Sequence, residues 1–157
     1  MTSQPSPGLH IKRPCLLVAD LDRSLSLYRD ILGFRLDYVG EASAESYLYT
    51  VFQLPAEAQL RFAALTSDKE ERALALTEVK HFALSPPIPP HRQATVIQVA
   101  SILPLLDPIK SAGLTVLPPS HFTAPPNLAF TEQGVYDFDG HLIVLYDVTV
   151  QCDGSAG

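Results

Sequence analysis

The stretch of sequence that decides the fold is LVADLDRSLSLYRDILGF, residues 17–34. It begins within an apolar run over residues 11–19, which predicts a strand, and it continues through Asp20, a residue type that caps helix N-termini. Apolar residues then recur at helical spacing, at Leu21, Leu25, Tyr28 and Leu32. Gly33 suits the position just after a helix end. The stretch therefore predicts a strand followed directly by a helix over residues 22–32.

The first half of the chain continues mainly with strands. The sequence predicts them over three ranges, 34–39, 60–67 and 72–79. The last two are joined by the charged turn DKEE and form a hairpin. Residues 43–54 could form another strand, but a capping Ser43 and the stop at Pro55 favour a short helix.

The second half repeats the first after a Pro-rich connector over residues 80–93, which is expected to run extended. A shift of 81 positions places Leu16 on Ile97 and Leu25 on Leu106. The matching positions are the apolar residues of a strand and a following helix, which a duplicated unit should preserve.

The second copy has its own set of predicted elements. They are a helix over residues 101–112 and strands over residues 94–100, 114–118, 132–138 and 141–148. Ser101 can cap the helix, which Pro108 should kink or shorten because proline lacks an amide donor. Residues 118–127 are Pro-rich and predict a long loop, and Asp139-Gly140 predicts a turn between the last two strands.

These patterns divide the chain into two modules, residues 10–79 and 94–150, with the connector at residues 80–93 as a linker. The ends, residues 1–9 and 151–157, are rich in Ser, Gly and Pro or other small residues and are expected to be flexible.

The composition indicates one globular domain, or two small units that share a core. The chain has 157 residues, of which 46% are hydrophobic and 18% charged, with a mean hydropathy of +0.13. The hydrophobic content is ample for a core, and the charge content is too low for a disordered chain. The net charge is −6, the pI is about 5.2, and basic residues are not clustered, so we expect neither a nucleic-acid partner nor a membrane partner.

Two cysteines, Cys15 and Cys152, lie far apart in a sequence with no secretory signal pattern and no apolar run long enough to span a bilayer. We therefore expect a cytoplasmic protein without disulfides.

Two segments resemble a known family. Residues 17–34 resemble the opening of the first module of the vicinal oxygen chelate superfamily, which includes glyoxalase I, extradiol dioxygenases and bleomycin-resistance proteins. Residues 137–145, DFDGHLIVL, resemble the closing hairpin of the second module. The resemblance implies an α+β fold in which two βαβββ modules form one incomplete barrel around a pocket. It also suggests a homodimer.

Metal-using members of this family place one ligand on the first strand and one on the last strand of each module. By resemblance to their motifs, these positions are Arg13, Ala75, Ala94 and Val144. None of the four offers the carboxylate, imidazole or neutral oxygen that divalent cations need. We therefore expect no metal site and no cofactor.

Other residues could supply relocated ligands. Glu78 and His81 have the spacing E-x-x-H, but this spacing brings ligands together on a helix, whereas these residues lie at a strand end. Polar surface residues are the simpler interpretation of this pair. The other four histidines, His10, His91, His121 and His141, are expected to be solvated loop residues.

The alternation of side chains along strands predicts which residues line the pocket. The predicted ligand-binding set is Arg13, Cys15, Ala75, Thr77, Ala94, Gln98, Val144 and Tyr146. On the third strand either Arg61 or Phe62 points inward, and Phe62 is the candidate for this set. Such a mostly apolar lining with a few polar groups is typical of small-molecule sites.

Arg13 is the one cation expected in this pocket, and its planar fork suits a carboxylate or enolate. Alternatively, it pairs with Asp37, Glu78 or water near the mouth. Cys15 could be a reactive thiol, although a cysteine in an apolar strand is more often a small buried hydrophobe.

Three functions follow from the sequence. The first is a metal-free member of the family that binds, with or without turnover, a small, largely apolar organic molecule that is either anionic or neutral. The second is a metal-dependent lyase or dioxygenase with relocated ligands. The third is a non-catalytic dimeric interaction protein. No catalytic residue is assigned, and any activity would be of the lyase, isomerase or dioxygenase type.

Overall fold

The computed structural model describes residues 8–152, so most of the two ends expected to be flexible lies outside the described residues. The first module contains β1 (Cys15–Val18), α1 (Leu21–Leu25), β2 (Arg35–Glu41), α2 (Tyr47–Val51), β3 (Gln59–Thr66) and β4 (Leu74–Lys80). A π-helical segment, η1 (Ser26–Ile31), continues α1. Asp20 accepts a hydrogen bond from the Arg23 amide, as expected of an N-cap, and Gly33 has a φ of +97°.

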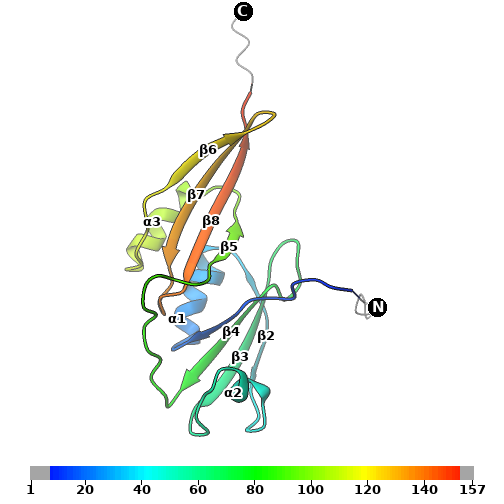
Figure 1. Cartoon of the computed structure of the whole chain (residues 1–157), viewed down its shortest axis with the longest axis vertical. Coiled ribbons are helices and arrows are strands. Elements are labelled where there is room, and N and C mark those ends of the chain that lie inside the picture. Colours follow the sequence, from blue (N-terminus) through cyan, green and yellow to red (C-terminus); the bar gives the residue numbers. More distant parts are fainter. Residues whose placement is uncertain (1–7, 153–157) are drawn as a thin grey trace, which may run out of the picture.

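The second module follows residues 81–94, which form neither helix nor strand. It contains β5 (Thr95–Gln98), α3 (Leu103–Ser111), β6 (Ser120–Ala124), β7 (Leu128–Tyr136) and β8 (Leu142–Val150). Figure 1 shows the first module in the lower half of the view and the second in the upper half. None of the helices within residues 8–152 is long and apolar enough to cross a membrane.

The two modules have the same sheet topology. The strand orders are β1-β4-β3-β2 and β5-β8-β7-β6. In the first sheet β1 runs parallel to β4, and in the second sheet β5 runs parallel to β8. The two four-stranded sheets remain separate and do not close into a barrel. The predicted fold class, α+β with two βαβββ modules in an incomplete barrel, is thereby confirmed.

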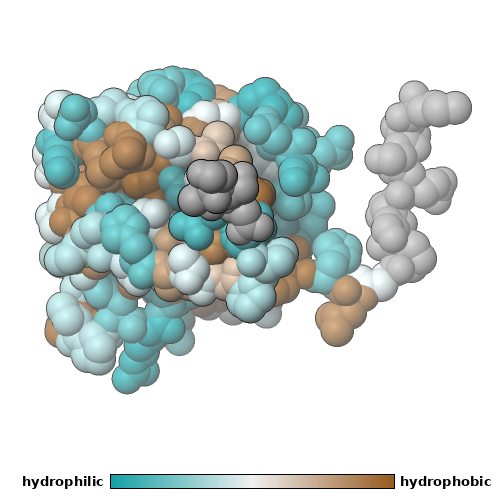
Figure 2. All heavy atoms as spheres, turned by 90° about the horizontal axis from the view of Figure 1, so that it is seen from above, coloured by the Kyte–Doolittle hydropathy of each residue, from teal (hydrophilic) through white to brown (hydrophobic). Residues whose placement is uncertain are grey.

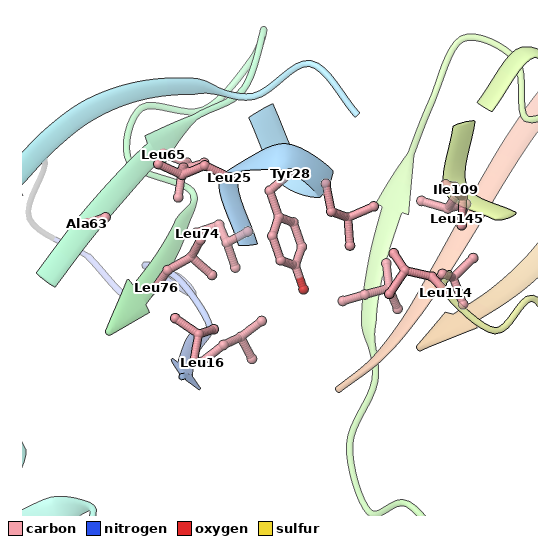
Figure 3. Packing of buried hydrophobic residues seen from close by; sticks show 14 of the residues in the cluster. Leu16, Leu25, Tyr28, Ala63, Leu65, Leu74, Leu76, Ile109, Leu114 and Leu145 are labelled. Atoms are coloured by element: carbon pink, nitrogen blue, oxygen red, sulfur yellow. The ribbon is translucent and has the colours of Figure 1, made fainter. Parts of the chain in front are cut away.

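Both sheets turn one face toward a shared hydrophobic core. Leu16 and Leu76 enter it from the first sheet, and Ile143 and Leu145 enter it from the second. Tyr28 is fully buried between the two groups, as Figure 3 shows. We call the side of each sheet that is turned away from this core its outer face.

The N-termini of α1 and α3 are each held by a carboxylate from the last strand of their own module. The amide of Leu21 donates to Glu78 Oε2 at 2.6 Å, and the amide of Ile102 donates to Asp147 Oδ2 at 2.8 Å. The prediction that Ser101 caps the second helix is wrong, because Ile102 is the N-cap residue and makes no side-chain capping bond. Asp147 satisfies this helix end instead.

The predicted strand over residues 114–118 is also wrong. Val116 forms only an isolated bridge to Val135, and β6 lies within the stretch expected to be a loop. Pro118 and Pro119 have no amide hydrogen, so ladder pairing cannot continue through them. The strand forms after them, where consecutive amides are available.

Candidate ligand-binding site

The outer face of the first sheet carries the first half of the predicted site. The register aligns Cys15, Ala75, Ala64 and Tyr38 in one row across the four strands. The next row is Leu17, Thr77, Phe62 and Gly40. Phe62 therefore lies on the outer face, whereas Arg61 lies on the opposite side with Glu78.

The floor of this outer face is made of small side chains. Ala64, Ala75 and Thr77 are fully buried, while Phe62 is half-buried and Cys15 is exposed. A small apolar cluster that includes Leu60 covers one end of the face. Thr77 Oγ1 is buried and has no hydrogen-bond partner among the described residues.

Arg13 lies just before β1, at the other end of this face. Its Nη1 donates to the carbonyl oxygen of Arg72 at 3.0 Å. The two carboxylates predicted as alternative partners of Arg13 each pair with another arginine. Arg72 pairs with Asp37 at 2.7 Å, and Arg61 pairs with Glu78 at 3.1 Å. Within residues 8–152, Arg13 has no carboxylate partner.

The second half of the predicted site lies on the outer face of the second sheet. Gln98 is paired with Tyr146 in the register, and the Tyr146 hydroxyl donates to Gln98 Oε1 at 2.9 Å. Val144 is half-buried, and Ala94 is exposed just before β5. These four residues form an exposed surface rather than a closed lining.

The structure groups the predicted residues by module. Both outer faces point away from the shared core. Within residues 8–152, no hydrogen bond or ion pair joins the predicted residues of the first module to those of the second module. That the two sets line one common pocket stays a prediction.

Sequence reasoning missed a cavity at the junction of the modules. It has a volume of about 590 Å³, and Cys15 is the single predicted residue that lines it. The rest of its lining comes from Leu17, Ala19, Arg23, Phe52, residues 84–87 of the connector and residues 138–141. Residues 137–141 belong to the motif DFDGH, but nothing local in that motif shows that it contacts β1.

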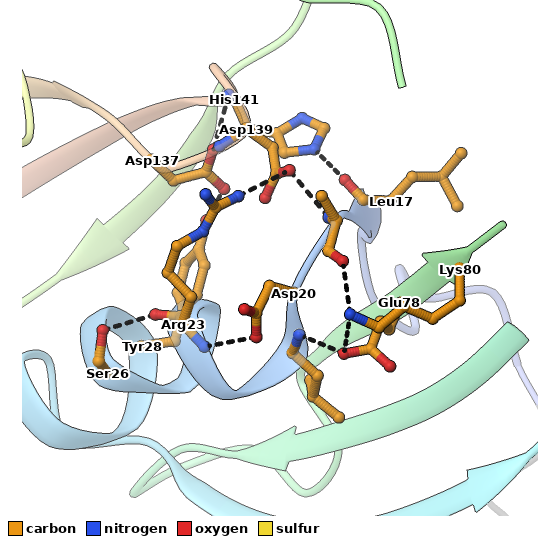
Figure 4. A network of polar contacts seen from close by, with 12 residues as sticks. Leu17, Asp20, Arg23, Ser26, Tyr28, Glu78, Lys80, Asp137, Asp139 and His141 are labelled. Carbon is orange, nitrogen blue, oxygen red and sulfur yellow. Dashed lines mark hydrogen bonds and ion pairs between the residues drawn. The ribbon is translucent and has the colours of Figure 1, made fainter. Parts of the chain in front are cut away.

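The turn between β7 and β8 binds the first module through a polar network (Figure 4). Asp137 accepts hydrogen bonds from the Tyr28 hydroxyl at 2.7 Å and from the amides of Asp139 and His141. Asp139 in turn accepts one from the Ala19 amide at 2.9 Å. Through these polar contacts, the turn fixes the second module against the first.

Two pKa values in this network are shifted. Burial raises the pKa of Tyr28 well above its usual value, and the neighbouring Asp137 carboxylate raises it further. Burial also raises the pKa of Asp139, against the opposing effect of the hydrogen bond from the Ala19 amide. Both pKa values are raised mainly because Tyr28 and Asp139 lie where the two modules meet and enclose them.

The prediction that His141 is a solvated loop residue is wrong. Its ring is half-buried, and Nε2 lies 2.7 Å from the carbonyl oxygen of Leu17. The turn places this ring against β1. The sequence of the turn predicts its backbone conformation but not its contact with a strand of the other module.

The described residues offer no evident metal centre. No group of three or more His, Cys, Asp or Glu side chains within residues 8–152 is arranged to hold a metal ion. Glu78 is buried and engaged by Leu21 and Arg61, whereas His81 is exposed.

Comparisons with known proteins identify the family. Residues 10–145 match the model of the Glyoxalase/Bleomycin resistance protein/Dioxygenase superfamily. No curated protein matches the chain.

Three solved structures have similar folds. A glyoxalase family protein from Bacillus cereus has 12% identity and a TM-score of 0.68, with 94% of this chain and 99% of that chain covered. A glyoxylase/bleomycin resistance protein/dioxygenase domain from Frankia sp. has 16% identity and a TM-score of 0.61, with 94% and 96% covered. The fosfomycin resistance protein FosX from Listeria monocytogenes, in complex with Mn(II) and sulfate, has 15% identity and a TM-score of 0.57, with 89% and 93% covered. The chain belongs to the Glyoxalase/Bleomycin resistance protein/Dioxygenase superfamily.

Proposed function

We propose that this protein binds a small, largely apolar organic anion on the outer face of the first sheet, without a metal ion. The observation that carries this proposal is a floor of small side chains, including Ala75 and Thr77, that ends at a guanidinium, Arg13, with no carboxylate partner among the described residues. A half-buried arginine without a carboxylate favours an anionic ligand.

The metal-free part of the proposal rests on residue chemistry. The four positions that hold metal in relatives carry Arg13, Ala75, Ala94 and Val144 here, and alkyl groups and a guanidinium are not ligands for divalent cations. Both cysteines are free and exposed, which suits the reducing cytoplasm in which we place the protein.

A thermal-shift screen with aromatic carboxylates tests the proposal. We expect several to stabilise the wild-type protein, and we expect Arg13→Ala to weaken the best ligand about tenfold or more, since a hydrogen bond to a charged group contributes about 1.5–3 kcal/mol. Arg29→Ala is the matched control, because Arg29 pairs with Asp30 on an exposed surface of η1.

Two results would contradict the proposal. One is ligand binding that is unchanged in Arg13→Ala. The other is a stoichiometric divalent metal, found by elemental analysis of protein purified without chelators, which would favour the metal-dependent alternative.

We further propose that the protein is a homodimer in which a second copy covers the outer face of the second sheet. Val96, Phe122 and Val150 are exposed, with Val96 at 61% of its accessible surface. Figure 2, which looks onto the end that carries the second module, shows apolar patches between hydrophilic residues. Exposed apolar patches on soluble proteins mark interaction surfaces.

Light scattering tests this assembly. We expect a dimeric mass for the wild-type protein and a monomeric mass for Val96→Asp, because a buried unpaired charge at an interface costs several kcal/mol. Leu103→Asp is the control, since Leu103 is exposed on α3 outside this face. A monomeric wild-type protein, or a dimer that tolerates Val96→Asp, would contradict the proposal.

A further inference from the structure

Two aromatic rings and the Arg72 guanidinium lie together on the first outer face, and Arg13 binds the backbone of Arg72 beside them. The ring centroids of Tyr38 and Phe62 are 6.4 Å apart, and the guanidinium carbon of Arg72 lies 5.5 Å from the centroid of the Tyr38 ring. A side chain at Gly40 would clash with the Tyr38 ring, so this ring lies along β2 over Gly40, which is the strand partner of Phe62. The result is an aromatic surface with a cation above one edge.

Arg72 is held in place by its backbone as well as by its side chain. Its amide donates to Thr66 Oγ1 at 2.9 Å, and its carbonyl oxygen accepts from Arg13 Nη1. Its φ is +49°, a left-handed conformation that few non-glycine residues adopt. Such conformations persist where the surroundings enforce them, and they are concentrated at functional sites.

We infer that Arg72 and Tyr38 complete the site, and that the ligand it takes is a planar aromatic carboxylate. This inference rests on the proposed function and names its ligand class. The aromatic ring of the ligand stacks beside Phe62 and Tyr38, and its carboxylate lies between the guanidiniums of Arg13 and Arg72.

The charges in this region fit one carboxylate. Asp37 neutralises Arg72 through a contact of 2.7 Å, whereas Arg13 has no carboxylate partner within residues 8–152. A ligand carboxylate therefore balances the cluster of two arginines and one aspartate. Aromatic surfaces and a planar guanidinium both prefer flat partners, which distinguishes an aromatic acid from an aliphatic one.

Isothermal titration with benzoate and with cyclohexanecarboxylate tests this inference, because the two acids have the same charge and differ in ring planarity. We expect benzoate to bind about threefold or more tightly, as ring pairing contributes about 0.5–1.5 kcal/mol beyond area burial. Tyr38→Leu should remove most of this preference. Asp37→Asn should strengthen binding of both acids by a few fold, because it removes a negative charge beside the ligand.

Arg72→Gly is the decisive variant. Glycine adopts positive φ without strain and retains the backbone groups that bind Arg13 and Thr66, so the substitution removes only the side chain and, with it, the partner of Asp37. We expect affinity for both acids to fall about tenfold, as for loss of one charge-assisted hydrogen bond. His81→Gly is the matched control, because His81 also has a positive φ, of 63°, and lies at the far end of β4. Circular dichroism verifies that each variant is folded.

The outcomes separate this inference from the proposed function. If neither acid binds the wild-type protein, the proposed function fails and the inference fails with it. If Arg13→Ala weakens binding while Arg72→Gly and Tyr38→Leu bind as the wild type does, the inference alone is overturned. Equal affinity of the wild type for the two acids would also overturn the assignment of an aromatic ligand.

Discussion

Replacing Asp137 with alanine lowers the free energy of unfolding by about 3–5 kcal/mol, because a buried carboxylate that accepts three hydrogen bonds is lost. The Tyr28 hydroxyl and the amides of Asp139 and His141 would then be left without their acceptor. Tyr28 and Asp137 are buried where the modules meet, so water cannot readily replace the missing group. Urea unfolding followed by circular dichroism measures the change.

Tyr28→Phe provides the intermediate case. It removes one donor and leaves the two amide contacts to Asp137, so we expect a loss of about 1–2 kcal/mol. Asp30→Ala is the matched control, because Asp30 is an exposed carboxylate that pairs with Arg29, and its loss should leave the free energy of unfolding nearly unchanged. An Asp137→Ala variant as stable as Asp30→Ala would contradict the role given to this network.

The second large effect is expected at Glu78. Glu78→Ala should lower the free energy of unfolding by about 2–4 kcal/mol, since a buried carboxylate that accepts from a helix-end amide and from a partly exposed guanidinium is lost, and a hydrogen bond to a charged group contributes about 1.5–3 kcal/mol. The Leu21 amide would lose its acceptor, and the Arg61 guanidinium would lose its carboxylate. Chemical denaturation at neutral pH gives the value.

Asp147→Ala and Glu78→Gln test the reason for this effect. Asp147 holds the N-terminus of α3 in the same way but is less buried, so its removal should cost about 1 kcal/mol. Glu78→Gln retains an oxygen acceptor for the Leu21 amide and should be milder than Glu78→Ala. If the glutamine variant is as unstable as the alanine variant, the ion pair with Arg61 outweighs the helix cap.

Local patterns were enough to predict the order of elements. Period-two alternation and the repeat at 81 positions identified the strands and helices that form the shared core, because residues such as Leu16 and Ile97 face it in both modules. They failed at Ser101, where the acceptor comes from a distant strand. They also failed around Pro118, where proline clusters indicated a loop although an edge strand forms just beyond them.

The candidate site was predictable only where strand alternation decides the face. Ala75 and Thr77 share the outer face as their spacing predicted, whereas the choice between Arg61 and Phe62 needed the strand pairing, which places Phe62 beside Thr77. Arg72 had no such signal, because it follows a charged turn and resembles any solvated surface residue until its φ and its contact with Arg13 are known. The junction cavity was equally hidden, since its walls come from both modules.

Because the inner faces of both sheets supply the common core, the residues that stabilise the chain and the residues available for recognition are largely different ones. Substitutions at outer positions such as Phe62 or Val144 alter the chemistry offered to a ligand while the packing around Tyr28 is retained. This architecture lets the chemistry of the outer faces change at little cost in stability, and an arginine and three alkyl side chains at positions 13, 75, 94 and 144 are therefore compatible with an intact fold.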